Sequence, residues 1–222
     1  MDLASFSASV GHAFRDESLL RRALTHRSYA SEHNERLEFL GDSIVNCAIA
    51  FELYRKFPQL SEGDLSRLRA SLVSQPSLAR IAGQFRLGQQ LLLGEGELKS
   101  GGMRRPSILA DALEAVIGAA FLDAGFDAAH GVVRTLFASA LLEVDPQAAK
   151  DAKTLLQEHL QGRRLPLPQY TVAATRGEAH DQRFEVECFV AALGIRTRGA
   201  GTSRRAAEQA AAHEAYEQAI AK

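Results

Sequence analysis

The spacing of hydrophobic residues divides the chain into two parts of different character. From Ser18 to about Leu142, hydrophobic residues recur at intervals of three and four, which is the period of an amphipathic α-helix. Short breaks that contain proline or paired glycine interrupt this pattern at 57–58, 75–76 and 101–102. The pattern predicts an all-α N-terminal domain.

The C-terminal part instead alternates hydrophobic and polar residues over short stretches. These stretches are separated by glycine-containing turns and predict strands at 170–175, 184–190 and 195–198. Before the first strand, Asp151 can cap a helix that begins there and runs to Gln161. After the last strand, an alanine-rich helix is expected over 203–221. The order α-β-β-β-α predicts a small α+β domain in which both helices cover one face of the sheet.

A polar segment that contains proline, residues 143–149, marks the change between the two patterns. We therefore expect an N-terminal domain over 1–145, a linker over 146–150 and a C-terminal domain over 151–222. No internal repeat or low-complexity tract suggests another arrangement.

Three carboxylates share one face of the helix expected around residues 34–43. Glu35, Glu38 and Asp42 follow one another at i, i+3 and i+7, and hydrophobic residues occupy another face. An acidic helix face is most often solvated and without a specific role. The choice between that interpretation and a binding site depends on the rest of the chain.

A second helix, expected over 107–122, favours a binding site. It is hydrophobic on nearly every side, and its two ionisable residues, Asp111 and Glu114, share one face. Unpaired carboxylates inside a protein are costly, and this helix carries no basic residue that would neutralise them. Divalent cations between the two acidic faces would supply the missing charge, and oxygen ligands favour Mg²⁺ or Mn²⁺ over zinc. Such sites support metal-assisted phosphoryl transfer, with structural calcium binding as the alternative.

Composition limits the classes of protein to be considered. Hydrophobic residues make up 46% of the chain and charged residues 24%, which argues against a disordered or fibrous protein. Because the net charge is −1, binding to a nucleic acid would depend on local clusters of basic residues. Cys47 and Cys188 stand far apart in the sequence, and we expect both to be buried. The start of the chain does not resemble a signal peptide and no stretch is long and apolar enough for a membrane helix, so the cytoplasm is the expected compartment, without a membrane partner.

The segment Asn34–Ser43, NERLEFLGDS, resembles the signature of the ribonuclease III family. Further stretches resemble the family in order and spacing, namely 23–29, 66–73, 94–102 and 107–114. The resemblance implies a catalytic centre that binds Mg²⁺, for which Mn²⁺ can substitute. It implies that the metal-binding and catalytic carboxylates are Glu38, Asp42, Asp111 and Glu114, with Glu35 lining the same acidic site.

The resemblance also implies a homodimer. In such a dimer, Phe39 inserts into the partner subunit, and each of two catalytic centres cuts one strand. From the sequence alone, a phenylalanine on a helix is more often a core residue of its own chain.

Several basic residues near the acidic segments allow two interpretations. His26 and His33 stay outside the predicted catalytic set, since a histidine near a helix start is commonly structural or solvated. Lys99, Arg104 and Arg105 lie in or beside a glycine-rich loop, where they could meet phosphates or remain solvated.

Residues 151–220 resemble a double-stranded RNA-binding domain, a module that reads the shape of an A-form duplex more than its sequence. Two arginines at a helix N-terminus suit a phosphate, although a solvated helix start is the alternative. The chain departs from the family pattern at Glu208, where another basic residue is common. Ten Lys or Arg against nine Asp or Glu over 151–222 predict modest, salt-sensitive binding. The resemblance places RNA contacts at Thr154, Gln157, Glu158, His180, Arg204 and Arg205.

These features predict an endoribonuclease that hydrolyses double-stranded RNA with water activated by divalent metal ions. The resemblance implies 5′-phosphate products with short 3′ overhangs, and roles in processing ribosomal and messenger RNA precursors. One alternative is a non-catalytic protein that binds duplex RNA to regulate or assemble it, and another is a nuclease for DNA or single strands. The intact carboxylates argue against the first, and the C-terminal domain argues against the second. If the catalytic interpretation is right, the two acidic helices must lie close together in space.

Overall fold

A computed structural model describes residues 3–145, 151–177 and 182–221. Contacts within the chain divide it into two compact units, residues 1–146 and 147–222, which are described separately. The predicted fold class is confirmed, because the first unit is helical and the second has the order α-β-β-β-α. The linker predicted at 146–150 lies outside the described residues.

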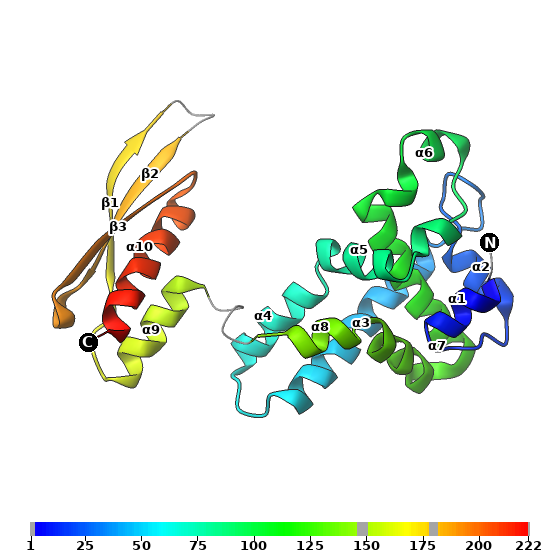
Figure 1. Ribbon diagram of the computed structural model, residues 1–222, viewed down its shortest axis with the longest axis horizontal. Coiled ribbons are helices and arrows are strands. Elements are labelled where there is room, and N and C mark those ends of the chain that lie inside the picture. The colour runs from blue at the N-terminus through cyan, green and yellow to red at the C-terminus, as the bar shows by residue number, and fades with distance from the viewer. Residues whose placement is uncertain (1–2, 146–150, 178–181, 222) are drawn as a thin grey trace. The chain divides into compact units, whose positions relative to one another are not determined.

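The N-terminal unit contains eight α-helices among the described residues, together with two short 3₁₀ turns (Figure 1). The helices are α1 (Leu3–Ser9), α2 (Glu17–Ala23), α3 (Glu35–Lys56), α4 (Glu62–Leu72), α5 (Gln75–Gln84), α6 (Glu95–Lys99), α7 (Pro106–Leu136) and α8 (Ala138–Glu143). Helix α7 is the structural centre of this unit, because its N-terminal half is buried on nearly every side and packs against α2, α3 and α5. The hydrophobic pattern over 107–122 therefore predicted an internal helix correctly.

Helix α7 is longer than the sequence pattern predicted. It continues past residue 122 to Leu136, with non-helical backbone angles at Ala124 and Gly125. The φ angle of Gly125 is +81°, a conformation that favours glycine. The kink redirects the second half of the helix, so that Val132, Val133 and Leu136 are buried as well.

In the described part of the C-terminal unit, a three-stranded antiparallel sheet is accompanied by two α-helices. Its strands and helices are α9 (Ala152–Gly162), β1 (Gln169–Arg176), β2 (Arg183–Val190), β3 (Ile195–Gly201) and α10 (Arg204–Ile220). Asp151 and Ser203 cap the two helices, since the Asp151 carboxylate accepts from the Thr154 N–H and the Ser203 hydroxyl from the Ala206 N–H. Strand β3 is longer than predicted, because its pairing with β2 continues as far as Phe184 and Gly201.

The core of the C-terminal unit lies between the sheet and the two helices (Figure 1). Leu156 and Leu160 of α9 and a row of alanines on α10 pack against Val190 and Ile195. Both helices thus cover one face of the sheet, as predicted. Cys188 is part of this core, as expected, but Cys47 is exposed on α3. The prediction for Cys47 was wrong because residue 47 falls on a solvent-exposed side of α3, whereas the next residue, Ala48, faces the core.

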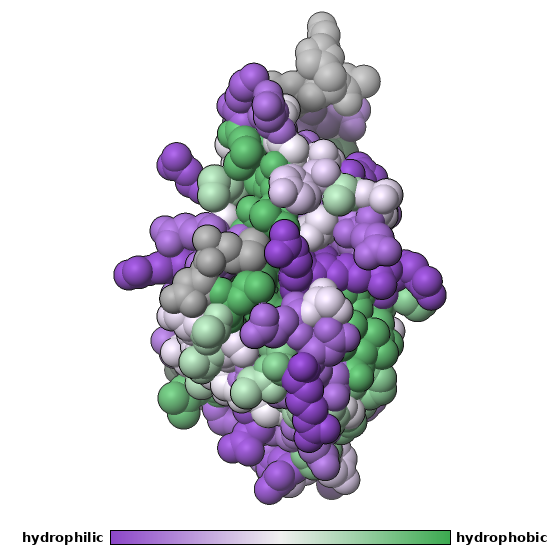
Figure 2. All heavy atoms as spheres, turned by 90° about the vertical axis from the view of Figure 1, so that its right-hand side faces the viewer, coloured by the Kyte–Doolittle hydropathy of each residue, from purple (hydrophilic) through white to green (hydrophobic). Residues whose placement is uncertain are grey.

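The outer surface is mainly polar on the face that Figure 2 shows, where hydrophilic side chains separate smaller groups of hydrophobic ones. None of the described helices combines the length and apolar character that crossing a membrane requires.

Candidate metal centre and nucleic-acid surface

Helices α3 and α7 approach each other closely because each carries a glycine where they meet. A β-carbon at position 41 would lie 1.8 Å from the carbonyl oxygen of Glu114, and one at position 118 would lie 2.3 Å from that of Leu37. Any other residue at either position would therefore force the helices apart. The close approach brings the acidic face of α3 beside the acidic residues of α7.

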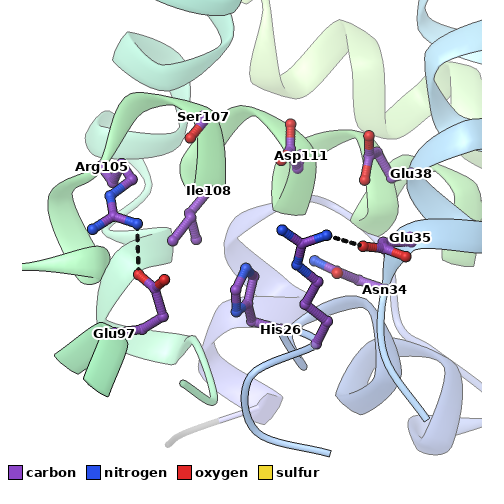
Figure 3. A pocket seen from close by; sticks show the side chains of 10 residues that line it. His26, Asn34, Glu35, Glu38, Glu97, Arg105, Ser107, Ile108 and Asp111 are labelled. Atoms are coloured by element: carbon purple, nitrogen blue, oxygen red, sulfur yellow. Dashed lines mark hydrogen bonds and ion pairs between the residues drawn. The ribbon is translucent and has the colours of Figure 1, made fainter. Parts of the chain in front are cut away.

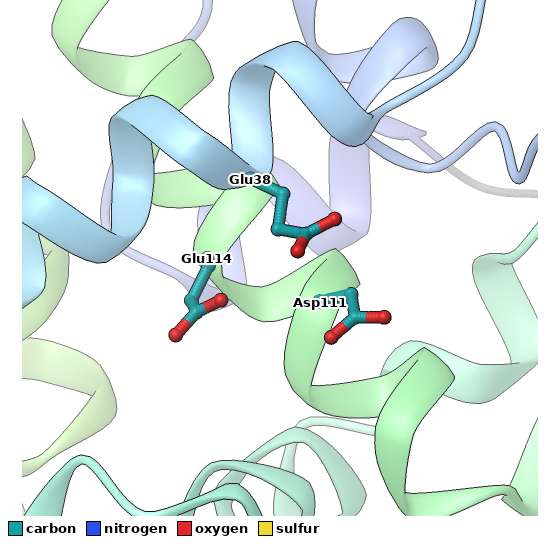
Figure 4. Close-up of side chains that lie close together, drawn as sticks. All are labelled: Glu38, Asp111 and Glu114. Atoms are coloured by element: carbon teal, nitrogen blue, oxygen red, sulfur yellow. The ribbon is translucent and has the colours of Figure 1, made fainter.

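Three carboxylates meet at this crossing. Glu38 comes from α3, while Asp111 and Glu114 come from successive turns of α7. One oxygen from each of the three side chains lies within 4.8 Å of the other two, and Figure 4 shows them facing the same space. All three side chains are half-buried, so they are available to a ligand but poorly hydrated.

The crossing holds an excess of negative charge. Burial raises the pKa of Glu114 to about 8, and the neighbouring carboxylates of Asp42, Glu38 and Asp111 add to this rise. Burial also raises the pKa of Glu38 and of Asp111, and for Asp111 nearby His26 and Arg27 only partly oppose the rise. Additional positive charge would therefore favour the ionised form of all three carboxylates near neutral pH.

The donor set fits a hard divalent cation. Carboxylate oxygens are the ligands that Mg²⁺, Mn²⁺ and Ca²⁺ prefer, and the described residues of the cluster include neither the sulfur nor the imidazole ligands that mark a typical zinc site. Glu38, Asp111 and Glu114 are the residues that could hold such an ion. An ion there would offset the repulsion that raises their pKa values.

The structure places Asp42 and Glu35 beside this cluster. Asp42 is exposed one turn beyond Glu38, and its side chain accepts a hydrogen bond of 3.0 Å from the Asn46 amide. Its charge reaches Glu114, but it does not belong to the group of mutually close oxygens. Glu35 is exposed at the start of α3 and pairs with Arg27 at 3.2 Å.

A pocket of about 450 Å³ opens beside the carboxylates (Figure 3). Glu35, Glu38 and Asp111 form one side, and Arg105, which pairs with Glu97 at 2.7 Å, lies on the opposite side. The pocket thus offers acidic and basic groups to one ligand, as a metal ion with a phosphate would require. Its lining residues are His26, Arg27, Asn34, Glu35, Glu38, Glu97, Arg105, Ser107, Ile108 and Asp111.

The basic residues near the glycine-rich loop have different positions. Of the three considered, only Arg105 lines the acidic pocket. Lys99 is exposed and lies 3.5 Å from Glu95, and Arg104 lines a separate pocket with Met103.

Arg27 and Glu97 line the acidic pocket but were not predicted from the sequence. Both lie in stretches that resemble the family, but no periodicity connects these stretches to the acidic helices. His26 also lines the pocket, and its Nδ1 lies 2.8 Å from the Ser28 hydroxyl. His33 is half-buried and 3.8 Å from Glu35.

Phe39 is not a core residue of its own chain. Its relative exposure is 79%, although the neighbouring Leu37 on the same helix is buried. A phenylalanine with so much of its side chain in solvent is a candidate for a binding surface.

The predicted RNA contacts of the C-terminal unit lie near the start of each helix. Thr154, Gln157 and Glu158 are on the first turns of α9, and Gln157 and Glu158 are exposed. Arg204 and Arg205 open α10, and both are exposed. His180 lies outside the described residues.

Comparisons with known proteins agree with the fold of the two units. Residues 16–141 match a family described as Ribonuclease-III-like, and residues 152–219 match the double-stranded RNA binding motif. A protein named Ribonuclease 3 from Thiobacillus denitrificans is 62% identical over 213 residues, which cover 96% of this chain and 94% of that protein. Another of that name from Bordetella petrii is 60% identical over 222 residues, covering 100% and 88%.

A solved structure is also similar. The nuclease domain of ribonuclease III from Campylobacter jejuni is 43% identical, with a TM-score of 0.62, and the match covers 65% of this chain and 99% of that one. The family match spans more than half of the chain, and the named relatives align along nearly all of it. The chain belongs to the ribonuclease III family.

Proposed function

We propose that the protein is an endoribonuclease that hydrolyses double-stranded RNA with the help of Mg²⁺, for which Mn²⁺ can substitute. The observation that carries this proposal is the meeting of Glu38, Asp111 and Glu114 where α3 crosses α7. A bound divalent ion lowers the pKa of water and neutralises negative charge on a phosphate. The family and the C-terminal unit define double-stranded RNA as the substrate.

The side chains divide this work. Glu38, Asp111 and Glu114 provide ligand oxygens from two helices whose crossing fixes their positions. Asp42 adds negative charge next to Glu114, which strengthens the attraction for a cation. Arg105 lies across the pocket, where its guanidinium can pair with a phosphate of the bound strand. Glu35 keeps Arg27 beside the same pocket through their ion pair.

The C-terminal unit would hold the duplex by its shape and phosphates. The exposed side chains of Gln157, Glu158, Arg204 and Arg205 are suited to such contacts, and we assign this role to them. We assign the same role to the half-buried Thr154 and to His180, which lies outside the described residues. This binding would orient the scissile bond at the acidic cluster.

We infer that the active form is a homodimer that uses the exposed Phe39 at its contact. A structure of the Campylobacter jejuni nuclease domain, 44% identical with a TM-score of 0.60, is described as flexible in a region involved in dimer formation. We place the enzyme in the cytoplasm, where bacterial RNA precursors are made. Ribosomal and messenger RNA precursors are candidate substrates there.

The proposal is tested by incubating the protein with a perfect RNA duplex in Mg²⁺ and then in EDTA. We expect cleavage in Mg²⁺ only, and a loss of more than about 100-fold for Glu114→Gln, because it removes a metal ligand. Glu143→Gln is the control, since it changes an exposed carboxylate at the end of α8 and should leave the rate unchanged.

The other functions predict different results in this assay. A nuclease without preference for duplex RNA would cut a DNA duplex or single-stranded RNA equally well. A protein that only binds RNA would leave the duplex whole under every condition. Cleavage that continues in EDTA and in the Glu114 variant would exclude the metal mechanism.

A further inference from the structure

Glu208 of α10 lies between two cations of the C-terminal unit. One carboxylate oxygen is 2.7 Å from Nζ of Lys153 on α9, and the other is 2.9 Å from Nε of Arg204 on α10. The Glu208 side chain is only 13% exposed, so both pairs are partly shielded from water. The hydrogen bond from Lys153 is the main reason that the pKa of Glu208 is lowered, which keeps the carboxylate ionised.

The bond to Glu208 engages only one edge of the Arg204 guanidinium. It uses the Nε–H, and the Arg204 side chain remains 65% exposed. Within the described part of the chain, Nη1 and Nη2 have no ion-pair partner. The four N–H groups on these two nitrogens form the fork that binds phosphate oxygens in pairs. Fixing Nε therefore orients the open fork without occupying it.

Lys153 links the same cluster to the start of α9. Its backbone N–H donates to Oε1 of Gln209 at 3.2 Å, and its ammonium lies 4.3 Å from the centre of the Tyr170 ring. Two successive residues of α10, Glu208 and Gln209, therefore hold the first turn of α9. Thr154, which follows Lys153, belongs to the other surface assigned to RNA contact. The cluster thus connects the two helix starts that would contact the duplex.

We propose that Glu208 is a positioning residue for duplex RNA binding, which fixes the Arg204 guanidinium and the start of α9 relative to each other. The inference rests on the proposed phosphate contact of Arg204. It reverses the expectation from charge alone, since a carboxylate near a phosphate-binding surface should repel RNA and its removal should strengthen binding. Without the Glu208 carboxylate, Lys153 and Arg204 would each lose this ion pair, and both long side chains would regain rotational freedom.

The test measures the affinity of the full chain for a perfect RNA duplex in EDTA over a range of salt concentrations. Glu208→Gln should weaken binding about tenfold, because Arg204 loses its fixed orientation and its charge-assisted contact. The slope of log affinity against log salt concentration should become shallower by about one, which corresponds to the loss of one phosphate contact. The same change is expected for Arg204→Ala. Glu217→Gln is the matched control, because it removes the same charge from an exposed position of α10. It should leave the affinity unchanged or slightly increased.

Two further measurements separate positioning from a general loss of structure. In a double-mutant cycle, Glu208→Gln should cause little further loss once Arg204 is alanine. In cleavage assays with Mg²⁺, the Glu208 variant should raise KM with kcat nearly unchanged. Circular dichroism of each variant establishes that the C-terminal unit remains folded.

The outcomes distinguish the inference from the function on which it rests. Tighter binding by Glu208→Gln, with an unchanged salt slope, would show that the carboxylate only repels RNA and would overturn the inference. The inference would also be overturned if the losses of binding free energy caused by the two substitutions added fully in the double variant, because the two residues would then act independently. If Arg204→Ala binds as the unaltered chain does, the Arg204 contact itself is wrong, although cleavage of duplex RNA would stand.

Discussion

At the scale of single residues, Glu114 connects the candidate metal centre to the stability of the fold. Burial, together with neighbouring carboxylates, raises its pKa from 4.5 to about 8. An acid whose pKa is higher in the folded state than in the unfolded state destabilises the fold as pH rises between the two values. In the absence of metal, this destabilisation begins near pH 4.5 and is complete above about pH 8.

Glu114→Gln should therefore stabilise the metal-free protein at pH 8, where the carboxyl group is fully ionised only in the unfolded state, and should have little effect at pH 4. Thermal unfolding in EDTA at both pH values measures this difference, and we expect Tm at pH 8 to rise by at least about 2 °C. Adding Mg²⁺ should raise the Tm of the unaltered chain more than that of the variant. An equal response to Mg²⁺ would show that the ion binds elsewhere.

At the scale of helices and strands, the crossing of α3 and α7 depends on Gly41 and Gly118. The β-carbon of an alanine at position 118 would lie 2.3 Å from the carbonyl oxygen of Leu37, so one of the helices would have to move. We expect Gly118→Ala to lower the free energy of unfolding by about 1–3 kcal/mol or more. It should also reduce cleavage, because Glu38 and Glu114 would no longer converge.

Gly131→Ala provides the comparison on the same helix. Nothing lies within 4 Å of a β-carbon at that position, so the alanine should stabilise α7 by up to about 1 kcal/mol. Urea unfolding of the two variants measures both changes. If the two substitutions changed the free energy of unfolding equally, the change at position 118 would come from α7 itself and not from its contact with α3.

The same crossing shows what the sequence could predict. The acidic face of each helix follows from helical spacing, which is a local property. The structure confirms both helices, α3 and α7. The meeting of these helices was a hypothesis based on the cost of buried charge. Spacing alone also could not separate Asp42 from the three convergent carboxylates, because it describes one helix and not its neighbours. The positions of Arg27 and Glu97 depend entirely on how distant segments fold together.

At the scale of the whole molecule, two units with different tasks share one chain of nearly neutral charge. The predicted basic surface is therefore a local arrangement of a few side chains, and the acidic cluster is equally local. Neither explains the exposed Phe39, whose side chain contributes nothing to the core of its own unit. A second copy of the chain would account for this exposure, since a buried aromatic anchor is typical of stable protein interfaces.

Phe39→Ala should weaken the proposed homodimer by about 30-fold or more, because aromatic anchors of this kind often contribute about 2 kcal/mol or more to binding. Sedimentation over a range of concentrations measures the dimer constant. Leu142→Ala is the matched control, since its side chain is 81% exposed on α8 and its removal should leave the constant unchanged. Because Phe39 lies outside the core, the variant monomer should still fold, and its Tm should depend less on concentration than that of the unaltered chain. A variant that dimerises normally but unfolds at a lower temperature would assign Phe39 to its own subunit and exclude it as the dimer contact.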